Sequence, residues 1–144
     1  PYVTSSHCTV AGALLNGVPH TCVRDVWGVA KVYETYVGSK LFEGPDPIFA
    51  KIREVGEEFG ATTGRARQVN WLDFDSLKMA ININGVNRLV FNKTDVLEEV
   101  NAWRLYEGLN MFEFISGEDM QYWICEQLKD INVDVVFSGD KDRI

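Results

Sequence analysis

The sequence predicts an α/β fold in which a mostly parallel β-sheet is flanked by helices. Two short apolar runs with β-branched residues, NRLVF at 87–91 and VDVVF at 133–137, are typical of strands buried in such a sheet. Apolar residues at helical spacing predict a helix over 118–130 between them. Strand, crossover helix and strand form a parallel β-α-β unit, which brings the carboxyl ends of both strands to one sheet edge.

The first part of the chain is predicted to be mostly loop and helix. Residues 4–21 are rich in Thr, Ser, Gly and Asn, and we expect a loop there with a short helix at 9–15. Apolar residues at helical spacing predict a further helix over 24–36, with Gly38 at its end.

Two more helices have start signals in the sequence. Asp46 with Pro47 forms a good N-cap and first-turn pair, and the apolar face of the helix that follows is expected to run to Phe59. Asp73 is expected to cap another helix, which ends at Gly85.

Length and charge limit the classes of function. The 144 residues correspond to about one domain. A net charge of −7 argues against nonspecific binding to nucleic acid or to anionic membranes. Three widely spaced cysteines do not predict a disulfide scaffold, and no apolar run approaches the roughly 18 residues of a membrane span. A cytoplasmic protein is therefore expected. Because Pro1 is not an initiator methionine, we expect the C-terminal part of a longer protein.

The segment GATTGRAR at 60–67 combines glycines, hydroxyls and two arginines. The nearest acidic residues on either side, Glu58 and Asp73, are several positions away, so a local salt bridge is not the obvious role of the arginines. Such a loop suits the binding of an anion by backbone N–H groups, hydroxyls and guanidinium groups. A polar surface loop is the alternative.

A second polar motif, NKTD at 92–95, directly follows the strand at 87–91. It resembles the guanine-reading element of GTP-binding proteins, in which a carboxylate accepts from N1–H and the 2-amino group of the base. Ser138 and Gly139 follow the next predicted strand, where those proteins have a short Ser-containing loop. The alternative is a solvated turn in which Lys93 and Asp95 form a surface ion pair.

Other charged residues suggest no chemistry. His7 and His20 have no second ligand at metal-binding spacing. The pairs Glu57–Glu58 and Glu98–Glu99 are expected on solvated helix faces.

Four motifs in order, PYVTSS (1–6), GATTGRARQVNWLD (60–73), NKTDVL (92–97) and SGDKDR (138–143), together resemble the C-terminal part of adenylosuccinate synthetases. YVGS (36–39) lies where that family has a similar Val-Gly turn. The resemblance implies a P-loop NTPase-like fold. It also implies a ligase of purine nucleotide biosynthesis, which uses a nucleoside triphosphate and Mg²⁺ to join L-aspartate to C6 of a 6-oxopurine nucleotide through a 6-phosphoryl intermediate.

The resemblance also implies roles for individual residues. The aspartate carboxylates would be held by the loop residues Thr62, Thr63, Gly64, Arg65 and Arg67. Thr4 would contact the phosphate of the purine nucleotide, with Val37 and Gly38 along its sugar and base. The base of the triphosphate, GTP or ATP, would be read by Lys93, Asp95, Ser138 and Gly139.

This chain departs from the family pattern in three respects. The family's catalytic aspartate, catalytic histidine and Gly-rich phosphate loop belong to an N-terminal half that is absent here, so no catalytic residue or metal ligand is assigned and this chain alone is expected to be inactive. Asn70 stands where the family has a glycine. The segment from Asp95 to the last strand is shorter than in common bacterial enzymes. In this compactness the chain resembles archaeal enzymes and the phage enzymes that act on dGMP.

The substrate is therefore expected to be IMP or, in a phage-like form acting in host cytoplasm, dGMP. The implied partners are aspartate, both nucleotides, the N-terminal portion of the same enzyme and a second copy of the chain. The alternative is a non-catalytic module that binds a purine nucleotide through NKTD and SGD.

Overall fold

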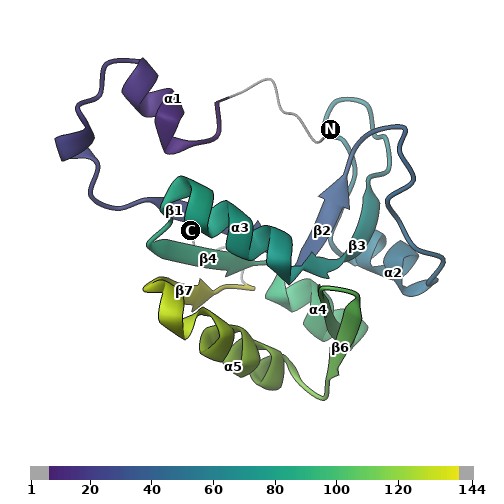
Figure 1. Ribbon diagram of the computed structural model, residues 1–144. Helices are drawn as coiled ribbons and strands as arrows, with labels where there is room; N and C mark the ends of the chain where they lie inside the picture. The colour runs from purple at the N-terminus through teal and green to yellow at the C-terminus, as the bar shows by residue number, and fades with distance from the viewer. Residues whose placement is uncertain (1–6, 140–144) are drawn as a thin grey trace.

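The computed structural model describes residues 7–139 and contains a three-stranded parallel sheet at its centre (Figure 1). The strand order is β1-β4-β7, with bounds β1 Trp27–Lys31, β4 Arg88–Asn92 and β7 Asp134–Phe137. β4 pairs in parallel with both neighbours, and Phe91 lies opposite Ala30 on one side and Phe137 on the other. The predicted adjacency of the strands near 87–91 and 133–137 is confirmed.

A second, mixed sheet lies beside the first in the order β2-β3-β5-β6. Its strands are β2 Tyr33–Tyr36, β3 Gln68–Asp73, β5 Trp103–Glu107 and β6 Asn110–Phe114. β3 pairs antiparallel with β2 and parallel with β5, and β5 pairs antiparallel with β6. None of these four strands was expected from the sequence.

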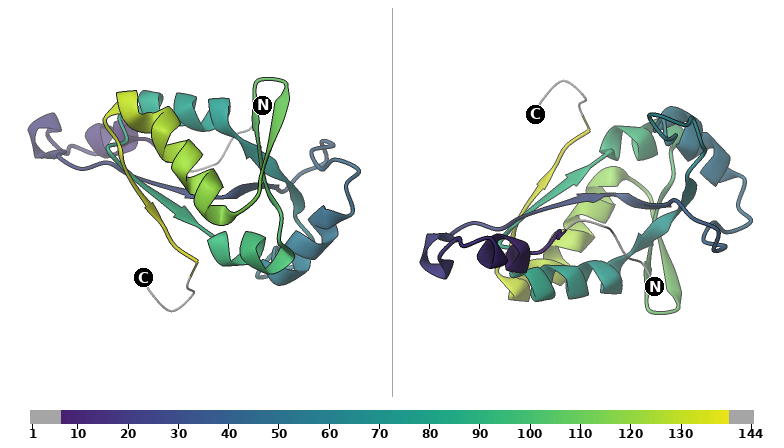
Figure 2. Two further views of the ribbon diagram at one scale, coloured as in Figure 1. Left: turned by 90° about the horizontal axis from the view of Figure 1, so that it is seen from below. Right: turned by 90° about the horizontal axis from the view of Figure 1, so that it is seen from above.

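Five α-helices and two short 3₁₀ helices complete the described part of the chain. The α-helices are α1 Val10–Leu15, α2 Ile48–Val55, α3 Phe74–Asn84, α4 Thr94–Val100 and α5 Gly117–Leu128; the 3₁₀ helices are His20–Cys22 and Lys129–Ile131. Both views in Figure 2 show α3 and α5 on one side of the strands and α2 and α4 on the other. This is a layered α/β arrangement, as the sequence predicts.

The helix expected over residues 24–36 is wrong, because this segment forms β1 and β2. Apolar residues here fit a period of two as well as a helical period. In β1, Trp27 and Val29 are exposed while Gly28 and Ala30 are partly covered. β-branched and aromatic residues favour strands, and Gly28 is unfavourable within a helix. Gly38 consequently follows a strand and not a helix.

The helix signals at Asp46 and Asp73 are confirmed. Asp46 accepts a hydrogen bond from the Ile48 backbone N–H at 3.0 Å, at the start of α2. Asp73 caps α3 by accepting from the Ser76 N–H at 3.1 Å, and Gly85 ends that helix in the left-handed conformation. α2 stops at Val55, so Phe59 lies outside the helix predicted to contain it.

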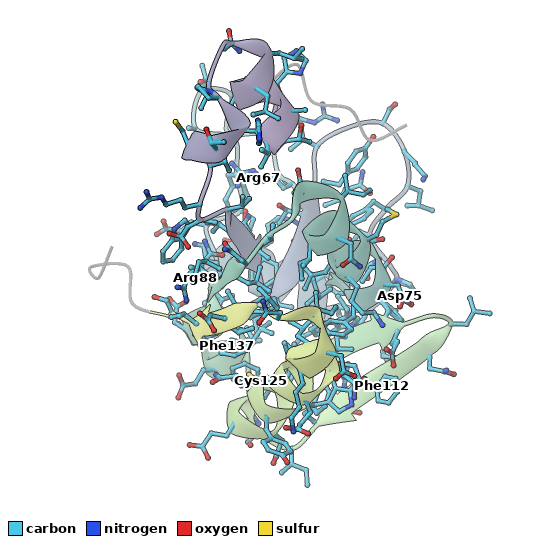
Figure 3. The ribbon with its side chains drawn as sticks, turned by 60° about the vertical axis from the view of Figure 1, so that its left-hand side comes forward. Arg67, Asp75, Arg88, Phe112, Cys125 and Phe137 are labelled. Atoms are coloured by element: carbon cyan, nitrogen blue, oxygen red, sulfur yellow. The ribbon has the colours of Figure 1, made fainter. Side chains whose placement is uncertain are left out.

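A continuous apolar core joins both sheets to the helices. Its largest fully buried side chains include Tyr33, Phe49, Trp71, Phe74 and Phe91. Around Trp123 of α5, the rings of Phe74, Phe112 and Phe114 lie 5.1 to 5.8 Å away between centroids, so α3, α5 and the β5–β6 hairpin share one aromatic cluster. Phe112 and Phe137 are labelled in Figure 3.

The parallel sheet sets the position of the polar motifs. β1 ends at Lys31, β4 at Asn92 and β7 at Phe137, and Lys31 is the register partner of Asn92. The carboxyl ends of all three strands therefore lie at one edge, where open α/β sheets bind their ligands.

Removing the cap of α3 tests this description of the fold. We expect Asp73→Ala to lower the free energy of unfolding by about 1 kcal/mol, since the Ser76 N–H loses its acceptor. Asp73→Asn is the matched control because its side-chain oxygen can still cap the helix. Chemical denaturation of both variants measures the difference, and equal losses of stability would contradict the capping role.

Candidate functional site

The GATTGRAR segment forms a tight turn between α2 and β3. Phe59 and Ala66 form an isolated antiparallel bridge, and the Gly60 N–H donates to the Arg65 carbonyl at 2.8 Å. Gly64 has φ +64°, a conformation that favours glycine. The threonine side chains and Arg65 are exposed on this turn.

The turn lies against the Val37–Gly38 segment. Arg65 Nη2 donates to the Gly38 carbonyl at 3.3 Å, and Gln68 Nε2 reaches the same oxygen at 3.4 Å. The structure thus brings together two motifs that are 27 residues apart in the chain and were assigned to aspartate and to the purine nucleotide.

A cavity of about 570 Å³ opens along β2 and reaches Tyr36, the residue before Val37. It is lined by Lys31, Tyr33, Glu34, Thr35, Tyr36, Phe42, Asp73 and Ser76. Burial raises the pKa of Glu34, and a hydrogen bond from the Asp73 N–H opposes that rise. The volume falls within the range of small-molecule sites, and both aromatic and polar side chains line it.

Glu58 is the residue that sequence reasoning misplaced. It was expected on a solvated helix face, yet only 1% of it is exposed. Its Oε1 accepts from Lys31 Nζ at 2.7 Å and from the Tyr33 hydroxyl at 2.8 Å, while Oε2 accepts from Arg67 Nη1 at 2.7 Å. Arg67 is labelled in Figure 3.

The expectation that the loop arginines have no local salt bridge is therefore wrong for Arg67. The turn folds residues 58 and 67 against each other, and the Arg67 N–H donates to the Glu58 carbonyl at 3.0 Å. Two residues nine positions apart thereby become neighbours across the Phe59–Ala66 bridge. The signal in the sequence was a glycine at each end of a short turn, with opposite charges just outside it.

The contacts of this cluster favour an ionised Glu58 carboxylate. Burial acts to raise the pKa of Glu58, but hydrogen bonds from Lys31, Tyr33 and Arg67 outweigh it and lower that pKa. Burial lowers the pKa of Lys31 and raises the pKa of Tyr33, whose hydroxyl therefore stays protonated and donates to Glu58. A buried carboxylate with three donors is well satisfied.

The NKTD motif lies at the end of β4 and at the start of α4. Asn92 is the last residue of the strand, Lys93 has φ +66°, and Thr94 begins the helix. The motif is therefore a strand-to-helix junction that directly follows β4, and not the solvated turn given above as the alternative. Asp95 falls in the first turn of α4, where the helix dipole favours a negative charge.

Ser138 and Gly139 lie directly beside this junction. The Thr94 N–H points to the Ser138 carbonyl at 3.5 Å, and the Ser138 N–H donates to the Phe91 carbonyl at 2.8 Å. A Cβ added at Gly139 would be 2.7 Å from the Asp95 backbone nitrogen and 2.6 Å from Thr94 Oγ1, so a side chain there would collide with the motif. The two motifs predicted to share a base site are thus in contact.

Lys93 and Asp95 do not form the ion pair of the alternative reading. Lys93 Nζ donates instead to the Gly56 carbonyl at 3.0 Å. Across residues 7–139, no hydrogen bond or salt bridge to the Asp95 carboxylate is formed. Gly56 lies two residues before Glu58, so one short segment contacts both the NKTD motif and the arginine turn.

Thr4 lies outside the described residues. Glu98 and Glu99 are exposed on α4, as expected. Between residues 7 and 139, no group of three or more His, Cys, Asp or Glu side chains is arranged to hold a metal ion, and no helix of that region is long and apolar enough to cross a membrane.

Comparison with known proteins identifies the family. The family model described as adenylosuccinate synthetase matches residues 1–136. An adenylosuccinate synthetase from Thermus thermophilus is 48% identical over 104 residues, which cover 67% of this chain and 24% of that protein. One from Meyerozyma guilliermondii is 38% identical over 148 residues, covering 94% of this chain and 32% of that protein.

A solved structure agrees with these matches. The structure of fully ligated adenylosuccinate synthetase from Plasmodium falciparum aligns with a TM-score of 0.79 and 27% sequence identity, covering 96% of this chain and 43% of that one. The present chain spans about a quarter to a third of the length of the two curated relatives. Sequence and fold agree, and the chain belongs to the adenylosuccinate synthetase family.

Proposed function

We propose that this chain contributes the aspartate-binding and nucleotide-binding loops of an adenylosuccinate synthetase. The reaction joins the amino group of L-aspartate to C6 of a 6-oxopurine nucleotide. A nucleoside triphosphate first phosphorylates the oxygen at C6, and the amino group then displaces that phosphate. The chain forms the C-terminal portion of a larger catalytic domain. The N-terminal portion of that domain supplies the phosphate loop and the general acid–base groups.

The observation that carries the proposal is the arginine turn beside Gly38. A dicarboxylate needs two sets of paired donors, and Arg65 and Arg67 offer planar guanidinium groups on one tight turn. The hydroxyls of Thr62 and Thr63 are exposed on the same turn. Aspartate held here lies next to the Val37–Gly38 segment, at which we place the sugar and base of the purine nucleotide.

We propose IMP as the purine substrate. The relatives that match are adenylosuccinate synthetases by name, and adenylosuccinate is the product formed from IMP, which supports IMP over dGMP. The cavity lined by Tyr36, the residue before Val37, has a volume suited to a nucleotide. A direct comparison of IMP and dGMP as substrates of the full-length enzyme tests this choice, and exclusive use of dGMP would refute it.

We further propose that Asp95 reads a guanine base, which makes GTP the preferred triphosphate. The contact between Ser138–Gly139 and the start of α4 supports a shared pocket at this sheet edge, and the Asp95 carboxylate, unpaired within residues 7–139, is available to two donors. The alternative, a nucleotide-binding module without chemistry, leaves the arginine turn without a role, and we favour it less.

The remaining components follow from the family. Mg²⁺ accompanies the triphosphate, but residues 7–139 offer no cluster of ligands for it, so we assign it to no residue described here. We propose a cytoplasmic enzyme that acts as a homodimer. Size-exclusion chromatography with light scattering measures the oligomeric state.

Arg65 provides the first test. In the full-length enzyme, Arg65→Ala is expected to raise the KM for aspartate by about 30-fold or more, because a desolvated carboxylate loses its guanidinium partner at a cost of about 2–5 kcal/mol. The control is Lys51→Ala, which removes a positive charge from an exposed position of α2. Initial-rate kinetics with each substrate varied gives the three constants. An unchanged aspartate KM with raised nucleotide constants would show that the turn binds a different ligand.

Asp95 provides a second test. Asp95→Asn is expected to reduce kcat/KM for GTP and to improve use of xanthosine triphosphate, because the C2 oxygen of xanthine can accept a hydrogen bond from an amide. The control is Glu99→Gln, which removes one negative charge from an exposed position of α4. Competition binding of GTP and ATP completes the test. An equal loss of kcat/KM with every triphosphate in Asp95→Asn would contradict the guanine assignment. So would tighter binding of ATP than of GTP by the unmodified enzyme.

A further inference from the structure

We propose that Glu58 is a positioning residue, which holds the guanidinium of Arg67 so that one of its edges faces a carboxylate of aspartate. This inference rests on the proposed function of the arginine turn. It assigns a role to a residue that lies outside the GATTGRAR motif itself.

The carboxylate of Glu58 is held from three directions. Lys31 reaches it from the end of β1, the Tyr33 hydroxyl from β2, and Arg67 from the far side of the turn, all at 2.7–2.8 Å. The residue is 1% exposed. A charged group that is buried and bonded in this way has one position, so it is a fixed point from which Arg67 is oriented.

The contact with Glu58 selects which edge of Arg67 remains free. Only Nη1 donates to Glu58, whereas Nε and Nη2 make no hydrogen bond within residues 7–139. These two nitrogens form the side edge of the guanidinium, whose parallel N–H groups match both oxygens of a carboxylate. The side chain is partly exposed, with 32% of its surface open, so a ligand can reach it.

The backbone reinforces this orientation. The Arg67 N–H donates to the Glu58 carbonyl at 3.0 Å, and the Arg67 carbonyl accepts from Arg53 Nε at 2.7 Å. Arg53 is in turn paired with Glu43, whose carboxylate accepts from the Val69 N–H at 2.8 Å. Both the main chain and the side chain of Arg67 are therefore fixed before a ligand arrives, which reduces the entropy lost on binding.

The charges of the cluster also suit an anion. Lys31 and Arg67 each carry a positive charge and Glu58 one negative charge, so the group keeps one net positive charge. Glu58 lies between the two cations and lets them remain close, because without it their repulsion would push the partly exposed Arg67 toward solvent. Removing the Glu58 carboxylate therefore raises the net positive charge of the cluster and also displaces the guanidinium of Arg67.

The test is Glu58→Gln in the full-length enzyme, with Glu54→Gln as the matched control. Glu54 is an exposed residue of α2, and its substitution makes the same change in charge four positions earlier. The KM for aspartate is expected to rise about ten- to a hundredfold in Glu58→Gln, the loss of one charge-assisted interaction, and to stay unchanged in Glu54→Gln. The KM for IMP and for the triphosphate is expected to change less than the KM for aspartate, because Glu58 bonds directly to Arg67 and supports the proposed nucleotide sites only indirectly.

Glu58→Asp separates positioning from general stability. It keeps the charge but withdraws the carboxylate by one methylene, so the aspartate KM is expected between those of the unmodified enzyme and Glu58→Gln. Far-ultraviolet circular dichroism checks whether Glu58→Gln folds. If it does not, the aspartate KM of Glu58→Asp decides the question.

Two results overturn the inference: an aspartate KM unchanged in the folded variants, or an equal rise in all three constants, as general damage would cause. The unmodified enzyme distinguishes this failure from that of the proposed function. If it fails to join aspartate to IMP, the proposed function is refuted. If it is active and the Glu58 variants keep its aspartate KM, only the positioning role is refuted.

Discussion

The buried carboxylate of Glu58 connects the segments on which the candidate site depends. A carboxylate without partners in this position would be strongly destabilised, and the three donors from Lys31, Tyr33 and Arg67 offset that penalty. Those donors come from the end of β1, the start of β2 and the far side of the turn, so satisfying one charge fixes the relative placement of both sheets and the turn. Two residues earlier, the Gly56 carbonyl accepts from Lys93 and extends the connection to the end of β4.

The parallel sheet explains why the two proposed ligand loops lie near each other. Lys31 and Asn92 are register partners at the carboxyl ends of β1 and β4, and Ser138 follows the end of β7 at the same edge. Gly56 contacts Lys93 of the proposed base site and Glu58 contacts Arg67 of the proposed aspartate site, so one short segment connects the two. A reaction that uses a triphosphate to activate a purine for attack by aspartate requires such proximity, since it brings the reacting groups into one site.

Sequence patterns predicted the features that depend on local chemistry. The strand at β4, the crossover helix α5, the Asp73 cap and the contact between NKTD and Ser138–Gly139 all follow from apolar runs, capping residues and the geometry of a parallel unit. Features set by tertiary packing were missed. The residues of β1 fit two periodicities, and pairing with β4 decided between them. Glu58 resembled a surface residue because no pattern in the sequence shows that Lys31 and Tyr33 approach it from other strands.

The most direct test of this account is a crystal structure of the full-length enzyme with L-aspartate and IMP, in the absence of a triphosphate. The account predicts one aspartate carboxylate within about 3 Å of Nε and Nη2 of Arg67, with Arg65 close to the ligand and the Glu58 contact to Nη1 retained. The IMP ribose would lie against Val37 and Gly38. Aspartate bound away from the 60–67 turn, or Arg67 released from Glu58 when the ligand binds, would contradict it.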